Sequence, residues 1–324
     1  MDKAMTRALL AACLLPMLFT GALAQSYPAK PIRFYTPYPP GGTTDIMARL
    51  IGQKMYEEWK QPVIVEAKPG AGGNVGTDFV AKSAPDGYSI LMGASGPLAI
   101  NVTLFSKLPY DPVRDFAPVI LAAAVPLVLV VHPSVPAKTT KEFIALLKAQ
   151  PGKFNYASAG PGTPQHLTAE MFKFMTKVDV AHIPYKGSGP AITDLIGGQI
   201  PFAFESMIPV IPHVKGGKLR ALAVSSVKRS ALLKDVPTVA ESGVPNFEAT
   251  AWYGVVAPAG VPKDIIAKLN GEMLRVLKLP DIRERLAEMG SDFVGGTPEQ
   301  FGQLIKSEIV KWGKVVRESG ARAD

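Results

Sequence analysis

Cysteine is almost absent from this chain of 324 residues, in which the only one is Cys13. Cys13 lies in an N-terminal stretch where Lys3 and Arg7 precede an apolar run that ends in small residues. This arrangement is typical of a secretory signal peptide, so we expect residues 1–24 to be one and the mature protein to be periplasmic. The mature chain would then contain no cysteine, which excludes disulfides, thiolate metal sites and a cysteine nucleophile.

Long apolar runs are also lacking after the N-terminus. The longest candidate, residues 119–131, is interrupted by Pro126 and is shorter than the roughly 20 apolar residues that a membrane span needs. A lipid anchor on Cys13 is an alternative for the N-terminus, but the apolar run continues well past that residue. We therefore expect a soluble, exported protein.

Clustered charge of either sign is missing. The formal net charge of +8 is spread thinly, with no group of basic residues interleaved with aromatics. This pattern argues against a nucleic-acid partner. A mild positive field instead favours small anions.

Several signatures of enzymes and cofactor sites are absent as well. Residues 69–77, PGAGGNVGT, resemble a dinucleotide loop, but the next strand, YSILMGAS, ends without the acidic residue that would hold a ribose. The four histidines show no zinc-ligand spacing, and neither GASG nor YASAG completes a Gly-x-Ser-x-Gly elbow. We expect no cofactor, no metal and no catalytic residue.

What the chain does contain is a regular alternation of strand-like and helix-like stretches, the βαβ rhythm of a parallel sheet covered by helices. An irregular segment is expected after YSILMGA, followed by two apolar strands joined at Val125-Pro126. A second α/β series follows from about residue 140. The chain then returns through AWYGVVAP and finishes in helices.

A mature length of about 300 residues exceeds what a single core usually accommodates, which favours two lobes with a cleft between them. We place the crossings near Pro126 and residues 243–252, where Trp252 would pack at the hinge or cleft wall. The first lobe would be discontinuous, comprising residues 25–125 plus 246–324, and the second would comprise residues 126–245.

Three glycine-rich junctions precede expected helices, at residues 38–45, 70–78 and 158–163. The plainer interpretation is that glycine makes each turn and threonine or aspartate caps the helix. The alternative is that small residues let amides and hydroxyls surround an anion at the helix N-termini. Loops contributed by both lobes would face one cleft, which favours this alternative.

Four further side chains are candidates for ligand contact. Tyr38 and Tyr185 follow strands in corresponding places of the two lobes, and His166 begins the helix after the third glycine loop. Glu205 ends the strand PFAFES, where a buried acid needs a partner. Each of the four is also compatible with ordinary packing or surface contacts.

Over its whole mature length the chain resembles the Bug family of extracytoplasmic solute receptors, which are associated with tripartite tricarboxylate transporters. The segments that carry the resemblance are YPAKPIRFYTPYPPGGTTD, VIVEAKPGAGGNVGTDFVAKSAPDGYSILMG, LPYDPVRDFAPV, FNYASAGPGTPQHLTAE, HIPYKGSGPAITDLIGGQI and AWYGVVAPAGVP. The resemblance implies an α/β, two-lobed periplasmic binding protein with a hinge, which closes an interlobe cleft over a small carboxylate.

Carried over by position, the resemblance assigns ligand contacts to Tyr38, Gly41, Thr43 and Thr44 in the first lobe and to Ser158, Thr163 and His166 in the second. Asn74 and Ser95 are further candidates for the cleft wall. Members of the family commonly have Asp-Asn where this chain has Glu205-Ser206, so the far end of the ligand is expected to be recognised differently.

The function expected is capture of an aliphatic di- or tricarboxylate, an amino acid or an aromatic carboxylate by a monomer, for delivery to a membrane permease or a sensor. Two alternatives stay open at this point. One is an exported α/β hydrolase that uses Ser158 with His166 nearby. The other is an interaction domain whose cleft is vestigial.

Overall fold

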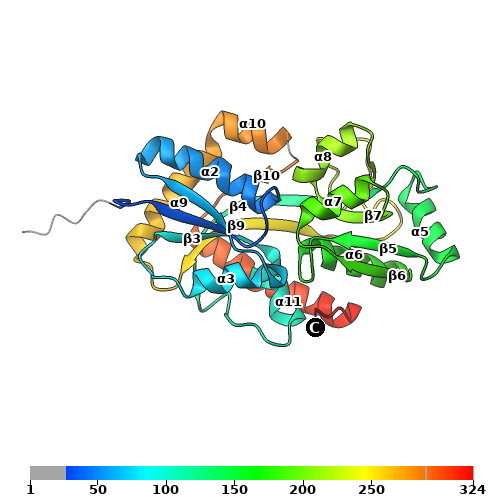
Figure 1. The fold of residues 1–324 in the computed structure, drawn as a ribbon, viewed down its shortest axis with the longest axis horizontal. Coiled ribbons are helices and arrows are strands. Elements are labelled where there is room, and N and C mark those ends of the chain that lie inside the picture. The colour runs from blue at the N-terminus through cyan, green and yellow to red at the C-terminus, as the bar shows by residue number, and fades with distance from the viewer. Residues whose placement is uncertain (1–26, 289, 324) are drawn as a thin grey trace, which may run out of the picture.

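The molecule is elongated and two-lobed, with helices on both faces of sheets that run along its long axis (Figure 1). The computed structural model describes residues 27–288 and 290–323, so the expected signal peptide and Cys13 lie outside the described residues. None of the helices described is both long and apolar enough to span a membrane.

The first lobe is built on a sheet with the strand order β2-β1-β3-β9-β4, and β10 pairs with the other edge of β4. The sequence predicted a parallel sheet, but only the β1–β2 and β1–β3 pairs are parallel, whereas β9 is antiparallel to both of its neighbours. The difference arises because β9 returns from the second lobe. The strands of this lobe are β1 (Ile32–Thr36), β2 (Val63–Ala67), β3 (Ser89–Ala94), β4 (Phe116–Val131), β9 (Thr250–Pro258) and β10 (Asp292–Phe293).

The second lobe continues the sheet through β4, which pairs with β7 on one side and β8 on the other, and β5 and β6 extend it beyond β7. Here the β5–β6 and β5–β7 pairs are parallel, as the βαβ rhythm predicts. These strands are β5 (Phe154–Ser158), β6 (Val180–Pro184), β7 (Phe202–Ser206) and β8 (Arg220–Val224).

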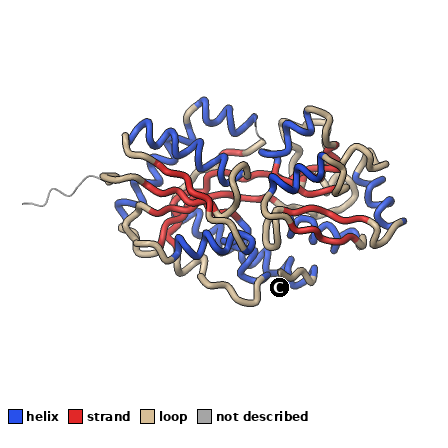
Figure 2. Tube along the Cα trace, in the orientation of Figure 1, coloured by secondary structure: helices blue, strands red, loops and turns tan. Residues whose placement is uncertain are grey.

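Strand β4 is a single element of 16 residues, which corrects the prediction of two strands joined at Val125-Pro126. Proline lacks the N–H that a central strand uses, so it normally interrupts a ladder. Pro126 lies where β4 changes partners: it is the last residue paired with β9, and the pairing with β7 begins at Leu127. The strand therefore passes through both lobes, as the red path in Figure 2 illustrates.

The helices form where apolar residues recur at helical spacing after a turn. In α2, for example, Met47, Ile51 and Met55 lie on one face and are buried against the sheet, and the helix ends at Lys60 in the left-handed conformation. The helices are α2 (Thr43–Trp59), α3 (Asn74–Ala81), α4 (Asn101–Leu104), α5 (Thr140–Ala149), α6 (Pro164–Thr176), α7 (Ser188–Ile196), α8 (Met207–Lys215), α9 (Lys263–Lys278), α10 (Pro280–Glu288) and α11 (Pro298–Ser319).

The segment after β3 is helical and not irregular, which is a second correction. A π-helical turn at Gly96–Ile100 leads directly into α4, and its five residues are all buried. A run of small and apolar residues without a polar face gave no helical periodicity to detect. Packing beneath α11 stabilises this segment.

The C-terminal helix α11 contacts β4 and α4 in the first lobe and α6 in the second. Its buried Glu308 accepts hydrogen bonds from the indole N–H groups of Trp252 and Trp312, both at 2.9 Å. Trp252 thus joins β9 to α11. It lines neither of the two cavities described below.

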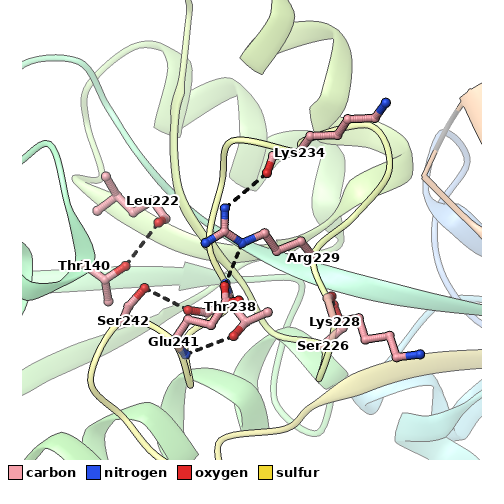
Figure 3. A network of polar contacts seen from close by, with 9 residues as sticks. All are labelled: Thr140, Leu222, Ser226, Lys228, Arg229, Lys234, Thr238, Glu241 and Ser242. Carbon is pink, nitrogen blue, oxygen red and sulfur yellow. Dashed lines mark hydrogen bonds and ion pairs between the residues drawn. The ribbon is translucent and has the colours of Figure 1, made fainter.

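The connection between β8 and β9 is long but ordered by short-range polar contacts (Figure 3). The carboxylate of Glu241 accepts from the backbone N–H of Thr238 at 2.9 Å and from Nε of Arg229 at 2.8 Å. The Thr238 hydroxyl in turn accepts from the N–H of Glu241. This reciprocal cap fixes the loop before β9 begins.

Gly254 provides a test of how tightly β9 packs on α11. A Cβ at this position would lie 2.3 Å from Cζ of Phe301 and 2.8 Å from the carbonyl oxygen of Ile120. We expect Gly254→Ala to lower the free energy of unfolding by about 1–3 kcal/mol, because overpacking forces the ring or the strand to move. Urea denaturation measures the change.

The control is Gly271→Ala in α9, where a Cβ would meet nothing within 4 Å. This substitution should be neutral or stabilise the protein by about 0.5–1 kcal/mol, since alanine is favoured over glycine inside a helix. Equal stability of the two variants would contradict the close packing of β9 on α11.

Candidate functional site

Residues from both lobes enclose a cavity of about 20 Å³ at the level where β4 changes partners. Three helices begin at its wall: α2 from the first lobe, and α6 and α7 from the second. Its lining residues are Tyr38, Pro39, Gly42, Thr43, Thr44, Ala159, Thr163, Pro164, Gln165, Gly187, Ser188 and Tyr253. None of these side chains is charged, so the electrostatics of the cavity depend on backbone dipoles and neutral polar groups.

The first-lobe wall comes from the turn before α2. Gly41 has a positive φ of 85°, and its N–H donates to the Asp45 carboxylate at 3.1 Å, which holds the turn against the first turn of α2. Gly42, Thr43 and Thr44 then line the cavity in the first turn of the helix, where backbone N–H groups have no intrahelical acceptor. Gly41 itself supports this wall without lining it.

Thr44 is the polar group of this wall that lacks a partner. Its side chain is 1% exposed, and its hydroxyl has no hydrogen-bond partner among the residues that the structure describes. A buried hydroxyl left unpaired costs free energy that a bound ligand recovers. Thr43 and Tyr253 also line the cavity, and the Tyr253 hydroxyl is 3.1 Å from that of Ser206.

The wall formed by α6 has few free donors. The Thr163 hydroxyl accepts from the N–H of His166 at 3.3 Å and donates to the carbonyl of Gly160 at 2.7 Å, so its only hydrogen is occupied. Pro164 has no N–H, which is usual at the first position of a helix. Thr163 therefore lines the cavity, but its hydroxyl caps α6 and has no hydrogen left to donate to a ligand.

The wall formed by α7 is backed by Glu205, which ends β7 and is completely buried. Its Oε2 accepts hydrogen bonds from Ser188 Oγ at 3.1 Å, from Gln165 Nε2 at 3.4 Å and from the Ser206 N–H at 3.1 Å. Its Oε1 has no partner in residues 27–288 and 290–323. Burial raises the pKa of Glu205 to about 7, although these hydrogen bonds oppose the shift.

A second cavity of about 700 Å³ adjoins the first and shares Tyr38, Pro39, Ala159 and Gly187 with it. The loop at residues 69–73 lines this larger cavity, together with Tyr185 and Lys186. The Tyr185 hydroxyl donates to Asp194 at 2.7 Å, and the Tyr38 hydroxyl donates to the carbonyl of Gly72 at 3.2 Å. The second glycine loop of the sequence analysis thus borders the larger cavity and not the smaller one.

Asn74 and Ser95 line neither cavity. The side-chain oxygen of Asn74 accepts from Asn101 at 2.6 Å and from the Tyr110 hydroxyl at 2.9 Å, which holds α3 against the helical segment after β3. Ser95 is fully buried beside that segment, and its hydroxyl is unpaired within the described part of the chain.

Ser158 and His166 lie behind the third glycine loop, outside the lining of both cavities. Ser158 Oγ is 2.6 Å from Nε2 of His182, whereas His166 accepts the Gly162 N–H at its Nδ1. The His166 and His182 rings stack with centroids 4.1 Å apart, and burial lowers their pKa values to about 4 and about 3. Ser158 is completely buried and lines neither cavity, so its hydroxyl is not placed to meet a substrate and the geometry does not support the hydrolase alternative.

Three polar residues of the small cavity were not predicted from the sequence: Gln165, Ser188 and Tyr253. Ser188 follows Gly187 at the start of α7, the same glycine-then-hydroxyl pattern as in the other loops, so it had a detectable signal. Gln165 and Tyr253 had none, because only tertiary structure shows which face of α6 and of β9 meets the cavity. The described residues also contain no group of three side chains suited to hold a metal ion.

Comparison with known proteins agrees with this architecture. The model of the tripartite tricarboxylate transporter family receptor matches residues 47–321. Protein BugT of Bordetella pertussis is 42% identical over 300 residues, which cover 92% of this chain and 92% of that protein.

Solved structures resemble the chain over nearly their full length. A periplasmic transporter has a TM-score of 0.89 at 42% identity, covering 92% of this chain and 100% of its own. An R. palustris protein with adipate has a TM-score of 0.89 at 34% identity, covering 91% and 99%. MatC from Rhodopseudomonas palustris with bound malate has a TM-score of 0.86 at 34% identity, covering 90% and 100%.

These matches extend over most of the chain, and the family model includes the starts of α6 and α7 at the small cavity. The chain therefore belongs to the tripartite tricarboxylate transporter receptor family, a class of periplasmic solute-binding receptors and not of enzymes.

Proposed function

We propose that this receptor binds a small carboxylic acid between its two lobes and delivers it to a membrane permease or a sensor. The observation that carries the proposal is the convergence of α2, α6 and α7, which begin at one cavity without a charged side chain in its lining. Helix N-termini carry partial positive charge, so their shared field favours an anion. No bond is made or broken in this role.

The ligands of two relatives support a carboxylate. The R. palustris protein solved with adipate and MatC solved with malate both hold a dicarboxylate, and each is 34% identical to this chain. Candidate ligand-contact residues in this chain are the polar groups that line the small cavity: Tyr38, Thr43, Thr44, Thr163, Gln165, Ser188 and Tyr253. Glu205 acts from behind the wall.

The wider biological setting is part of the same proposal. Export would use residues 1–24 as a signal peptide, and the receptor would act as a monomer beside its permease. We place the lobe boundaries near residues 126 and 246, since β4 changes partners at Pro126 and β9 begins at Thr250. Closure of the lobes would exclude water from the carboxylate and strengthen its hydrogen bonds.

The proposal is tested by a thermal-shift screen of mono-, di- and aromatic carboxylates, followed by calorimetric titration of those that stabilise the protein. We expect saturable stabilisation by at least one acid. Thr44→Val should weaken its binding by about 1–3 kcal/mol, because the substitution removes the unpaired hydroxyl and keeps the side-chain shape. Thr193→Val serves as the matched control, since Thr193 is exposed on α7 and bonds only within its own helix.

A screen in which no carboxylate stabilises the protein would contradict the proposed function. If Thr44→Val and Thr193→Val weakened ligand binding equally, the α2 wall would not be part of the binding site.

Gly96 tests whether closure of the lobes is needed for binding. A Cβ at Gly96 would lie 2.6 Å from the carbonyl oxygen of Gly162 across the cleft and 2.8 Å from the Tyr38 hydroxyl. We expect Gly96→Ala to hold the lobes apart and to lower ligand affinity at least about tenfold, equivalent to about 1.4 kcal/mol. Small-angle scattering with saturating ligand should show a larger radius of gyration than for the wild type, while Gly271→Ala behaves as the wild type. Unchanged affinity would mean that the lobes need not meet at this point.

A further inference from the structure

We infer that the ligand carries, besides its carboxylate, a hydrogen-bond donor such as a hydroxyl or an ammonium group, and that Glu205 imposes this requirement as a positioning residue. The inference rests on the proposed function and concerns the class of carboxylate. Its basis is an asymmetry between the two sides of the small cavity.

The α2 side offers donors. Its first-turn amides lack intrahelical acceptors, and the unpaired hydroxyl of Thr44 is free to donate. A carboxylate, which only accepts hydrogen bonds, fits this side.

On the other side, the side chains of Gln165 and Ser188 offer acceptors beside the first-turn amides of α7. Gln165 Nε2 donates one hydrogen to Ser188 Oγ at 3.2 Å and the other to Glu205 Oε2 at 3.4 Å, so that only its carbonyl oxygen stays available. Ser188 donates its single hydrogen to Glu205 Oε2 at 3.1 Å and accepts from Gln165, so one lone pair stays available. Because Glu205 takes both donors, these two side chains cannot donate to the ligand.

Glu205 itself lies behind the lining of the cavity. Its Oε1 is buried and has no partner within the described ranges 27–288 and 290–323. The two acceptors of Gln165 and Ser188, which have no side-chain donor beside them, favour a ligand that supplies one. A second carboxylate placed here would find no side-chain donor among these residues.

The neighbouring groups support an ionised Glu205 when such a donor is bound. Ser206 N–H also donates to Oε2, and the Ser206 hydroxyl is 3.1 Å from that of Tyr253, which lines the cavity. Glu205 is therefore connected to two residues of the cavity lining. It contacts Ser188 directly and Tyr253 through Ser206.

The test uses sets of acids that differ by one group: succinate, malate and aspartate, and glutarate, 2-hydroxyglutarate and glutamate. Isothermal titration of the wild type should give at least about tenfold tighter binding for a hydroxy or amino acid than for its unsubstituted partner. The malate and 2-hydroxyglutarate arms report a hydroxyl, whereas the aspartate and glutamate arms report an ammonium group.

Glu205→Gln should reduce this preference to less than about threefold while leaving the affinity for the unsubstituted acid within about threefold of the wild type. Glutamine keeps the shape but brings an amide donor and removes the charge. Ser188→Ala should reduce the preference in part. Glu170→Gln is the matched control, because Glu170 is a buried acid of α6 that pairs with Tyr156 and Lys173 and lines neither cavity.

Three results would overturn the inference: equal binding of substituted and unsubstituted acids by the wild type, an equal loss of all six acids in Glu205→Gln, or the same change of preference in Glu170→Gln. They differ from failure of the proposed function, in which no carboxylate of the wider screen binds at all. Circular dichroism of each variant confirms that the comparison is made on folded protein.

Discussion

Both lobes depend on one strand whose hydrogen-bonding partners change at a proline. Up to Pro126, β4 pairs with β9 and β10, and beyond it with β7 and β8. A residue that cannot donate is tolerated there because one ladder ends where the next begins. The two sheets thereby share β4, and the segments that follow β1 and β5 both line the small cavity.

The chemistry of the site follows from that relation. Helix starts from both lobes supply a positive field without any cation, which suits an anion that must be released again. The ligand specificity then depends on the orientation of the neutral side chains that line the cavity. A residue behind the lining fixes that orientation for two of them. Glu205 is a carboxylate outside the cavity that decides whether Gln165 and Ser188 present hydrogens or lone pairs.

Local signals in the sequence were sufficient for the α/β alternation and for the turns before α2 and α6, because glycine followed by threonine marks a helix start regardless of context. They were insufficient for Asn74 at the start of α3 and for Ser158 before α6, because the partners of these polar residues, Asn101 and His182, are distant in sequence. The continuity of β4 could not be predicted for a related reason. Whether a proline interrupts a strand depends on the strands that pair with it, and the sequence of β4 does not show which strands these are.

The C-terminal helix adds a constraint on how such a receptor moves. α11 packs on β4 and α4 in the first lobe and on α6 in the second, while Glu308 ties it to Trp252 of β9. A simple hinge would leave α6 free to swing away from the first lobe. With α11 beneath it, α6 can move away from the first lobe only by breaking this contact or by sliding along α11 in a shear motion, so the contact opposes a simple hinge opening.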